Sequence, residues 1–304
     1  MTGDPYDVCL EIARAHYENF PVASSLMPRD MRPHVAAVYA FARKADDFAD
    51  EENLAADYRH LLLTDWEHRL RVAAAGSAER DGSDDSAIFA ALEQTIAAFN
   101  LPLNLFTDLL SAFHQDVDVK RYATWADLLD YCRRSANPVG RLVLRISGRD
   151  AAAHDASSDA LCTALQLTNF WQDLERDWQK GRLYLPADVM TAHGADEGHV
   201  ASRTMTAPLR AALADAAERT RTLFEWGRFV CENVSGRLGL ELRATWLGGT
   251  RVLDRLEHAG FDVFRARPSL GWRDMPPLAA RLAWWSARAT SRSGVLGPPP
   301  TNQK

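Results

Sequence analysis

The sequence predicts an all-α protein, and three observations support this. Strand signals are nearly absent, because the 304 residues hold no Asn-Gly hairpin and no long run of alternating β-branched residues. Apolar residues recur at helical spacing throughout. No repeat or linker divides the chain, and 47% hydrophobic residues suffice for a large core. We therefore expect a single domain over residues 1–290 and a disordered Ser/Gly/Pro-rich tail at 291–304.

Start and stop signals place the helices of the first half of the chain. Pro21 ends the first helix, and Asp30 is expected to cap the second, with Pro33 in its first turn. A polar loop over 76–84 separates the third helix from the fourth, and a short connection before Pro102 separates the fourth from the fifth. The expected helices cover residues 5–19, 30–51, 54–75, 85–99 and 102–118.

The second half is divided in the same way. Thr124 with Asp127 resembles a capping box and opens a helix over 125–146, broken or kinked at Pro138. Ser157 or Ser158 is expected to cap the next helix, which ends at residue 179. A loop is expected over 194–207, and further helices are expected over 186–193, 208–234, 236–259 and 276–288.

Composition narrows the classes of function and the compartment. A net charge of −6 argues against a nucleic-acid partner, because no basic excess exists to neutralise phosphates. The start of the chain lacks the features of a signal peptide, and no run approaches ~18 apolar residues. Four cysteines in apolar helical runs, without a CxxC motif, indicate buried free thiols in a reducing compartment: Cys9, Cys132, Cys162 and Cys231.

We therefore expect a cytoplasmic protein, and a peripheral contact with the inner membrane stays open. The Trp284-Trp285 pair in the last expected helix either packs in the core or anchors the protein at a membrane interface.

An acidic stretch at residues 46–51 follows an apolar helical face. Asp46 and Asp50 are four residues apart, so on a helix they lie on the same side and repel each other. A cation would relieve that repulsion. Asp47 and Glu51 point off this stripe and either support the site or are solvated.

A second polar stripe could face the first. Asn169, Asp173 and Asp177 are each four residues apart, and all carry oxygen ligands of the kind that Mg²⁺ uses. Both stripes lie in aromatic and apolar helices, which chance alone rarely produces. The sequence therefore predicts a Mg²⁺ site between two helices.

Such a site suits the ionisation of a diphosphate. Mg²⁺ would offset the charge of the diphosphate and make it a leaving group, while aromatic faces in an apolar cavity stabilise the carbocation. Other phosphate or metal chemistry fits less well. The chain has no Glu-x-x-His pair for a di-iron bundle, no phosphate-binding Gly-rich loop and no dinucleotide fingerprint.

These motifs resemble those of the squalene/phytoene synthase family. The resemblance rests on Tyr39-x-Phe-x-Arg43-x-x-Asp46-Asp47-x-x-Asp50 and on Asn169-x-x-x-Asp173-x-x-x-Asp177, which is followed by Lys180-Gly-Arg182-x-Tyr184-x-Pro186. It spans about residues 15–257. The resemblance implies a single-domain isoprenoid-synthase helical bundle with a central apolar cavity, and head-to-head chemistry on prenyl diphosphates.

Two segments resemble one branch of this family, the bacterial hydroxysqualene synthases of hopanoid biosynthesis. They are residues 16–24, His-Tyr-Glu-Asn-Phe-Pro-Val-Ala-Ser, and residues 131–140, Tyr-Cys-Arg-Arg-Ser-Ala-Asn-Pro-Val-Gly. Members that perform the first condensation usually carry Ser-x-Ser-Phe and Ala-Gly-x-Val-Gly there. The branch implies a carbon–oxygen lyase that ionises presqualene diphosphate and lets water capture the rearranged cation, giving hydroxysqualene.

The branch also implies two functional partners, a presqualene diphosphate synthase and a flavin-dependent reductase. Two alternatives stay open. The chain either condenses two farnesyl diphosphates, as a farnesyltransferase, or keeps the fold as a non-catalytic scaffold.

Residue roles follow from the motifs and the resemblance. The expected Mg²⁺ ligands are Asp46, Asp50, Asn169, Asp173 and Asp177. Arg43 either binds diphosphate or neutralises the acidic stretch, and Arg182 either folds over the diphosphate with Tyr184 or caps the preceding helix. Tyr39 is either a ring facing the cation or a core tyrosine.

Other residues are assigned to the hydrocarbon and to the water. Cavity-lining residues are expected to include Tyr131, Ala136, Val139, Gly140, Leu165 and Gln166, although core packing explains Val139 and Leu165 as well. His16, Tyr17, Glu18 and Asn19 are candidates for placing the water, or are structural. His114, Asp116 and Asp118 are expected at a helix end on the surface.

Overall fold

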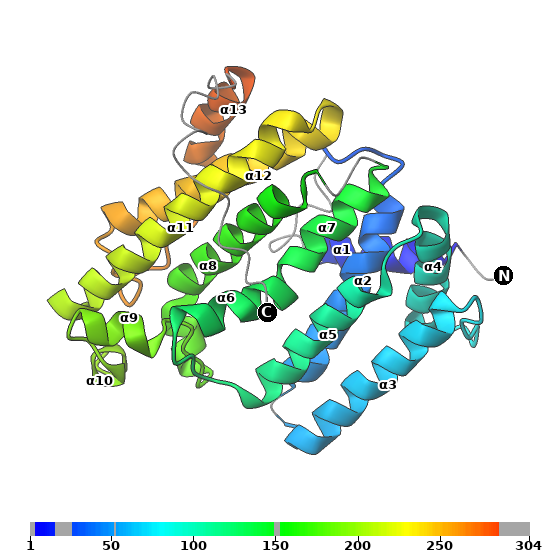
Figure 1. The fold of residues 1–304 in the computed structure, drawn as a ribbon, viewed down its shortest axis with the longest axis horizontal. Helices are drawn as coiled ribbons and strands as arrows, with labels where there is room; N and C mark the ends of the chain where they lie inside the picture. Colours follow the sequence, from blue (N-terminus) through cyan, green and yellow to red (C-terminus); the bar gives the residue numbers. More distant parts are fainter. Residues whose placement is uncertain (1–3, 16–25, 52, 149–152, 286–304) are drawn as a thin grey trace.

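A computed structural model describes residues 4–15, 26–51, 53–148 and 153–285 (Figure 1). This part of the chain is all-α, as predicted, and its one isolated bridge of the strand type joins Arg121 to Leu183. The helices are α1 (Pro5–Ala15), α2 (Arg32–Asp50), α3 (Ala56–Ala74), α4 (Asp84–Phe99), α5 (Leu103–Asp118), α6 (Trp125–Ser135), α7 (Asn137–Ile146), α8 (Asp155–Gln179), α9 (Ala187–Ala192), α10 (Glu197–Ala201), α11 (Ala207–Asn233), α12 (Gly236–His258), the 3₁₀ turn η2 (Trp272–Asp274) and α13 (Met275–Ala283).

The two helices that carry the polar stripes are each the centre of a group of helices. Helix α2 packs against α1, α3, α4 and α5, whereas α8 packs against α6, α11 and α12. Helix α7 touches both α2 and α8 and so joins the two groups (Figure 1). The stripes are thus held on opposite sides of the same interior.

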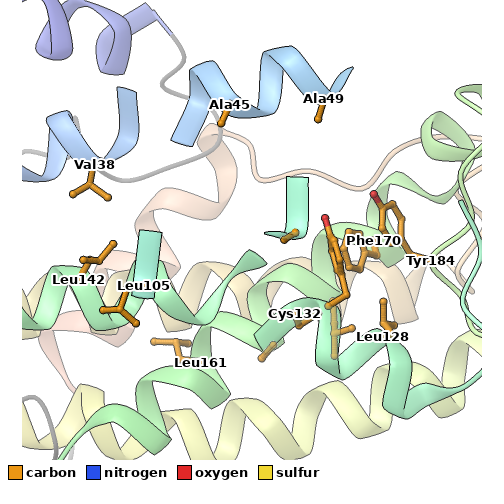
Figure 2. Packing of buried hydrophobic residues seen from close by; sticks show 14 of the residues in the cluster. Val38, Ala45, Ala49, Leu105, Leu128, Cys132, Leu142, Leu161, Phe170 and Tyr184 are labelled. Atoms are coloured by element: carbon orange, nitrogen blue, oxygen red, sulfur yellow. The ribbon is translucent and has the colours of Figure 1, made fainter. Parts of the chain in front are cut away.

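Apolar side chains from several helices fill the junction between these groups. Val38 of α2, Leu105 of α5 and Leu142 of α7 point toward one another and are at most 3% exposed (Figure 2). Burial of one such side chain stabilises the fold by about 1.5–3 kcal/mol. On α8, next to the polar stripe, the ring of Phe170 stacks on that of Tyr184 with 3.8 Å between the ring centroids.

Two predicted helix starts are wrong. Met31, and not Asp30, occupies the N-cap of α2, because Met31 is buried in the core while Asp30 stays exposed. Helix α8 starts at Asp155 after His154, so Ser157 and Ser158 lie in its first turn. The Ser157 hydroxyl donates to the carbonyl of His154, at 3.0 Å, and does not cap the helix.

Other predicted boundaries are confirmed or refined. The capping box of Thr124 and Asp127 is present at the start of α6. The expected helix over 125–146 is divided at Ala136, because Pro138 has no N–H to donate to the preceding turn and stands instead in the first turn of α7. The expected loop over 194–207 contains the short helix α10.

Several expectations concern residues near the two ends of the chain. The expected disordered tail at 291–304 and the residues His16, Tyr17, Glu18 and Asn19 lie outside the described residues. The last helix is shorter than expected and ends at Ala283. Within the described ranges, no helix combines the length and the apolar character needed to cross a bilayer.

Two glycines let neighbouring helices approach α8 closely. A Cβ at Gly227 of α11 would lie 2.8 Å from backbone atoms of Leu161, and a Cβ at Gly249 of α12 would lie 2.6 Å from the Leu165 side chain. Backbone atoms of a packed helix cannot move aside cheaply. The contact between α8 and α11 therefore requires glycine at position 227.

We expect Gly227→Ala to lower the free energy of unfolding by about 2 kcal/mol, because overpacking outweighs the gain in helix propensity. Urea unfolding followed by circular dichroism measures this change. Gly248→Ala is the matched control, since its Cβ would meet only Leu270 at an ordinary 3.6 Å, and it should be neutral or stabilising by up to about 1 kcal/mol. Unchanged stability of Gly227→Ala would show that α11 and α8 separate readily.

Candidate active site

A cavity of about 460 Å³ lies among α2, α7, α8 and α12. Its volume falls within the range of small-molecule sites, roughly 300–1,000 Å³. Most of its wall is apolar, with Val38, Val143 and Leu242 as examples. The predicted residues that line it are Tyr39, Arg43, Asp46, Tyr131, Ala136, Val139, Gly140, Leu165, Gln166 and Asn169.

The first acidic stripe forms one side of the polar end. Asp46 borders the cavity. Partial burial and the charge of Asp50, one turn away, raise the pKa of Asp46 to about 6. Asp50 pairs with Arg182 and lies 3.8 Å from the ammonium of Lys180. Asp47 is exposed and pairs with Arg43 at 2.5 Å, and Glu51 is exposed as well, so both point off the stripe.

The second stripe forms the opposite side. Asp173 is held by Arg267, whose Nε and Nη2 donate to the two carboxylate oxygens at 2.5 and 2.8 Å. Burial and the neighbouring charge of Asp173 raise the pKa of Asp177 to about 7, and Asp50 adds to this effect from across the site. The two stripes thus act on each other electrostatically.

Two arginines offer unsatisfied donors at this end. The Nε atoms of Arg43 and Arg182 are buried, and within the described part of the chain neither has a hydrogen-bond partner. The Arg182 side chain is only 12% exposed. A buried donor without a partner costs about 1–3 kcal/mol, which an anionic ligand would recover. The guanidinium of Arg182 pairs with Asp50 of α2 and does not cap α8, although the main-chain N–H of Arg182 donates to the carbonyl of Asp177 at 2.8 Å.

Arg267 is a site residue that the sequence reasoning missed. It lies in the segment between α12 and η2, almost a hundred residues after Asp173, and no local pattern marks it. The carbonyl of Pro268, next in sequence, accepts a hydrogen bond from Gln172, so this segment is fixed to α8 at two adjacent points. Arg267 therefore adds a further cation to the polar end.

Asp116 is also part of the interior, and its expected place on the surface is wrong. Its side chain is 6% exposed and accepts a hydrogen bond from the Tyr131 hydroxyl at 2.8 Å. Burial raises the pKa of Asp116 to about 7, and the charges of Asp46 and Asp50 contribute. Asp118, two residues later, is 62% exposed and pairs with His60 at the surface.

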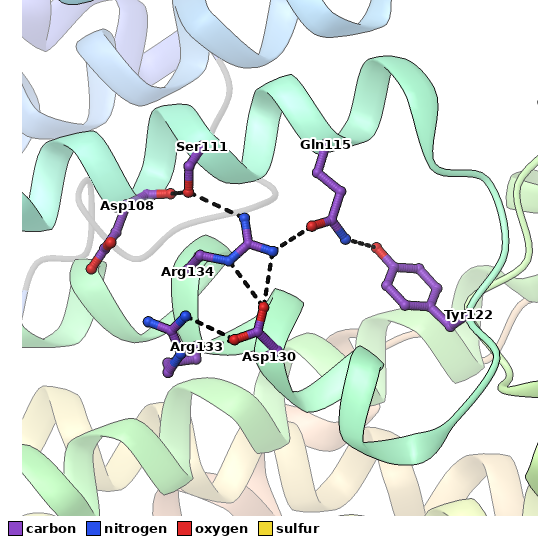
Figure 3. A network of polar contacts seen from close by, with 7 residues as sticks. All are labelled: Asp108, Ser111, Gln115, Tyr122, Asp130, Arg133 and Arg134. Atoms are coloured by element: carbon purple, nitrogen blue, oxygen red, sulfur yellow. Dashed lines mark hydrogen bonds and ion pairs between the residues drawn. The ribbon is translucent and has the colours of Figure 1, made fainter. Parts of the chain in front are cut away.

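A polar network holds α5 and α6 in the orientation that brings Asp116 to Tyr131 (Figure 3). Arg134 of α6 donates to Ser111 at 3.1 Å and to Gln115, both on α5. It also donates at 3.1 Å to Asp130, which lies one turn earlier on α6 and orients the guanidinium. Gln115 in turn donates to the Tyr122 hydroxyl at 3.2 Å. Tyr122, Tyr131 and Tyr184 lie within 6 Å of one another between ring centroids, so an aromatic floor lies beside Asp116.

The hydrocarbon end of the cavity contains two further features. Gly140 leaves room that a side chain would fill, because a Cβ there would meet Ser158 Oγ at 2.4 Å and Cys162 Sγ at 2.6 Å. Glu241 of α12 is 4% exposed and lines the cavity, although no local pattern marks it. The four cysteines are free, and Cys162 alone among them lines the cavity.

The donor chemistry of the two stripes fits a hard divalent cation. Carboxylates and the Asn169 amide are oxygen ligands, and burial together with a neighbouring carboxylate raises the pKa of Asp46 and of Asp177. In the described ranges, no three His, Cys, Asp or Glu side chains are grouped closely enough to hold a metal ion. Asp50 and Asp173 are each paired with an arginine.

Comparisons with known proteins identify the family of the chain. Residues 13–274 match the family model of squalene/phytoene synthases. A hydroxysqualene synthase of Zymomonas mobilis is 39% identical over 229 residues, 74% of each chain. One of Rhodopseudomonas palustris is 36% identical over 242 residues, 79% of this chain and 80% of that one. The solved structure of a squalene synthase from Alicyclobacillus acidocaldarius superposes with a TM-score of 0.77 at 40% identity, covering 84% of this chain and 94% of that one.

The family model spans most of the chain, and these relatives match it over more than two thirds of its length. The chain therefore belongs to the squalene/phytoene synthase family.

Proposed function

We propose that the protein is a Mg²⁺-dependent hydroxysqualene synthase. It ionises presqualene diphosphate and lets water capture the rearranged cation, releasing hydroxysqualene and diphosphate. The observation that carries the proposal is the pair of buried, unsatisfied Nε donors of Arg43 and Arg182 beside two facing carboxylate stripes. An anion bridged to a cation satisfies both sets of groups at once.

The residues divide the work between the two ends of the cavity. Arg43, Arg182 and Tyr184 bind the phosphate oxygens, while Asp46, Asp50, Asn169, Asp173 and Asp177 hold Mg²⁺. Bound Mg²⁺ supplies Lewis-acid stabilisation of the departing diphosphate. The C–O bond breaks with its electron pair going to the diphosphate.

The apolar end controls what happens to the cation. Tyr39 and Tyr131 present aromatic rings beside the polar end, where their faces stabilise positive charge. The wall around Val139 and Gly140 excludes bulk water, so that only one water adds to the cation and one proton is released. The residues that place this water are proposed to include His16, Tyr17, Glu18 and Asn19.

The choice of this reaction is supported by the two relatives at 36% and 39% identity, which are hydroxysqualene synthases. A presqualene diphosphate synthase would supply the substrate, and a flavin-dependent reductase would consume the product. The second candidate is condensation of two farnesyl diphosphates, which the name of the Alicyclobacillus structure favours. A non-catalytic scaffold explains neither the unsatisfied arginines nor the facing carboxylates.

Product analysis separates these candidates. Purified protein with Mg²⁺ and presqualene diphosphate is expected to yield hydroxysqualene without a reductant, detected by gas chromatography and mass spectrometry. Farnesyl diphosphate alone is expected to stay unconsumed. If farnesyl diphosphate is consumed, or if squalene forms only with NADPH, the condensing reaction replaces the proposal; turnover of neither substrate would favour the scaffold.

A further inference from the structure

The C-terminal helix α13 has an unusual outer face. A surface helix normally turns polar residues to the solvent. None of the residues of α13 is buried, and its exposed residues are apolar apart from Arg281. They are Met275, Pro276, Pro277, Ala279, Arg281 and Ala283. A helix that is apolar on its outer side calls for a further apolar contact.

Two exposed tryptophans flank this helix. Trp272 is 77% exposed and Trp284 is 81% exposed. The other large apolar side chains of the described chain that exceed about a third exposure are less exposed, with Leu61 at 60% as the next. Tryptophan is enriched where protein meets the headgroup layer of a membrane, because its ring is apolar and its N–H is polar.

The exposure of these tryptophans is not explained by a loosely attached segment, because the residues around them are fixed to the bundle. Asp274, between Trp272 and α13, is 1% exposed and pairs with Arg251 and Arg255 of α12 at 3.1 and 2.7 Å. Beyond α13, the ring of Trp285 packs edge-on against Trp246, and the guanidinium of Arg228 lies 4.4 Å above it. The expected Trp284-Trp285 pair is thus divided, since Trp285 packs inward while Trp284 is held outward.

The charge around this surface selects its partner. Between residues 271 and 285 the chain carries two arginines and one aspartate, although the whole chain has a net charge of −6. The aspartate is Asp274, which is already paired with two arginines of α12. Arg273 of η2 and Arg281 of α13 are both exposed. Apolar residues rimmed by basic ones match an anionic bilayer surface.

We propose that η2 and α13 form a membrane-docking surface, in which Trp272, Met275 and Trp284 enter the headgroup layer of an anionic bilayer and Arg273 and Arg281 bind its phosphates. In Figure 1, α13 lies at the outer edge of the bundle against α12, away from α3 and α4. Helix α12 also lines the cavity through Leu238 and Leu242. If the proposed function holds, docking brings the wall of the hydrocarbon cavity to the membrane that stores its apolar product.

Cosedimentation with vesicles tests the docking surface without reference to activity. The purified full chain is mixed with vesicles of phosphatidylcholine and phosphatidylglycerol in about a two-to-one ratio, or with phosphatidylcholine alone. We expect clear binding to the anionic vesicles. Trp272→Ala/Trp284→Ala should lower the partition coefficient by about tenfold or more. Arg273→Gln/Arg281→Gln should lower binding to the anionic vesicles by about tenfold and leave phosphatidylcholine binding unchanged.

The matched control is Tyr58→Ala/Leu61→Ala on α3, which removes side chains of 49% and 60% exposure and should bind like the wild type. All replaced side chains are exposed, so the variants should keep the circular dichroism spectrum and melting temperature of the wild type.

Three results would overturn the assignment. One is the absence of vesicle binding by the wild type, and another is equal binding by the tryptophan variant and the control. The third is gel filtration in which the wild type elutes as a dimer and only the tryptophan variant as a monomer, which would assign the face to a second copy of this chain.

Discussion

Asp46→Asn is expected to lower kcat/KM with presqualene diphosphate by about 10³-fold, which corresponds to ~4 kcal/mol of lost transition-state stabilisation. The amide keeps the size and one oxygen of the carboxylate but removes the charge that attracts the cation. Because Asp46 borders the cavity without anchoring the core, helical content measured by circular dichroism should not change.

Asp47→Asn is the matched control, since this neighbouring aspartate is exposed and points off the stripe. Its kcat/KM should stay within about twofold of the wild type. On the opposite helix, Asp173→Asn should behave like Asp46→Asn, and Glu175→Gln, whose partner is Arg203 outside the site, like Asp47→Asn. Near-normal turnover by Asp46→Asn or Asp173→Asn would remove that residue from the diphosphate site.

Asp116→Asn is expected to stabilise the protein in a pH-dependent manner. A carboxyl group whose pKa rises from 3.8 to about 7 on folding binds a proton more tightly in the native state. Native stability therefore falls as pH rises from the unfolded pKa through the folded one. The asparagine cannot ionise and still accepts the hydrogen bond from Tyr131. The gain should be on the order of 4 kcal/mol at pH 8 and less than half of that at pH 5.

Urea unfolding at the two pH values measures this difference. Asp118→Asn on the same helix is the control, because its 62% exposed side chain is screened by solvent, and the gain at either pH should be within about 0.5 kcal/mol. Equal stability of Asp116→Asn and the wild type at pH 8 would mean that Asp116 is solvated or paired with a cation in the native protein.

The sequence was sufficient to predict the helices and both polar stripes, because these depend on local spacing. Asp46 and Asp50, or Asn169 and Asp173, share a helix side whatever the rest of the chain does. The failures arose where tertiary contacts decide. Asp30 has a good capping side chain, yet the apolar Met31 takes the N-cap position because its burial fixes the start of α2.

The same distinction explains the site residues. Asp116 is part of an acidic run near a helix end, and only the packing of α5 against α6 shows that it is buried against Tyr131. Arg267 lies in a segment without regular structure, and only the path of the chain after α12 brings it to Asp173. Neither residue has a local pattern, so a single sequence offers no signal for them.

The glycines that face α8 have a consequence for the catalytic geometry. Leu161 and Leu165 are one turn apart, and each is seated against a different glycine, Gly227 of α11 and Gly249 of α12. To slide along its axis by one turn, about 5.4 Å, α8 would have to leave both notches at once. These contacts between glycine and leucine therefore set the position of the polar stripe, Asn169 to Asp177, along the axis of α8. Substitution of Gly227 or Gly249 should therefore displace the polar side chains of α8, although no charged residue is replaced.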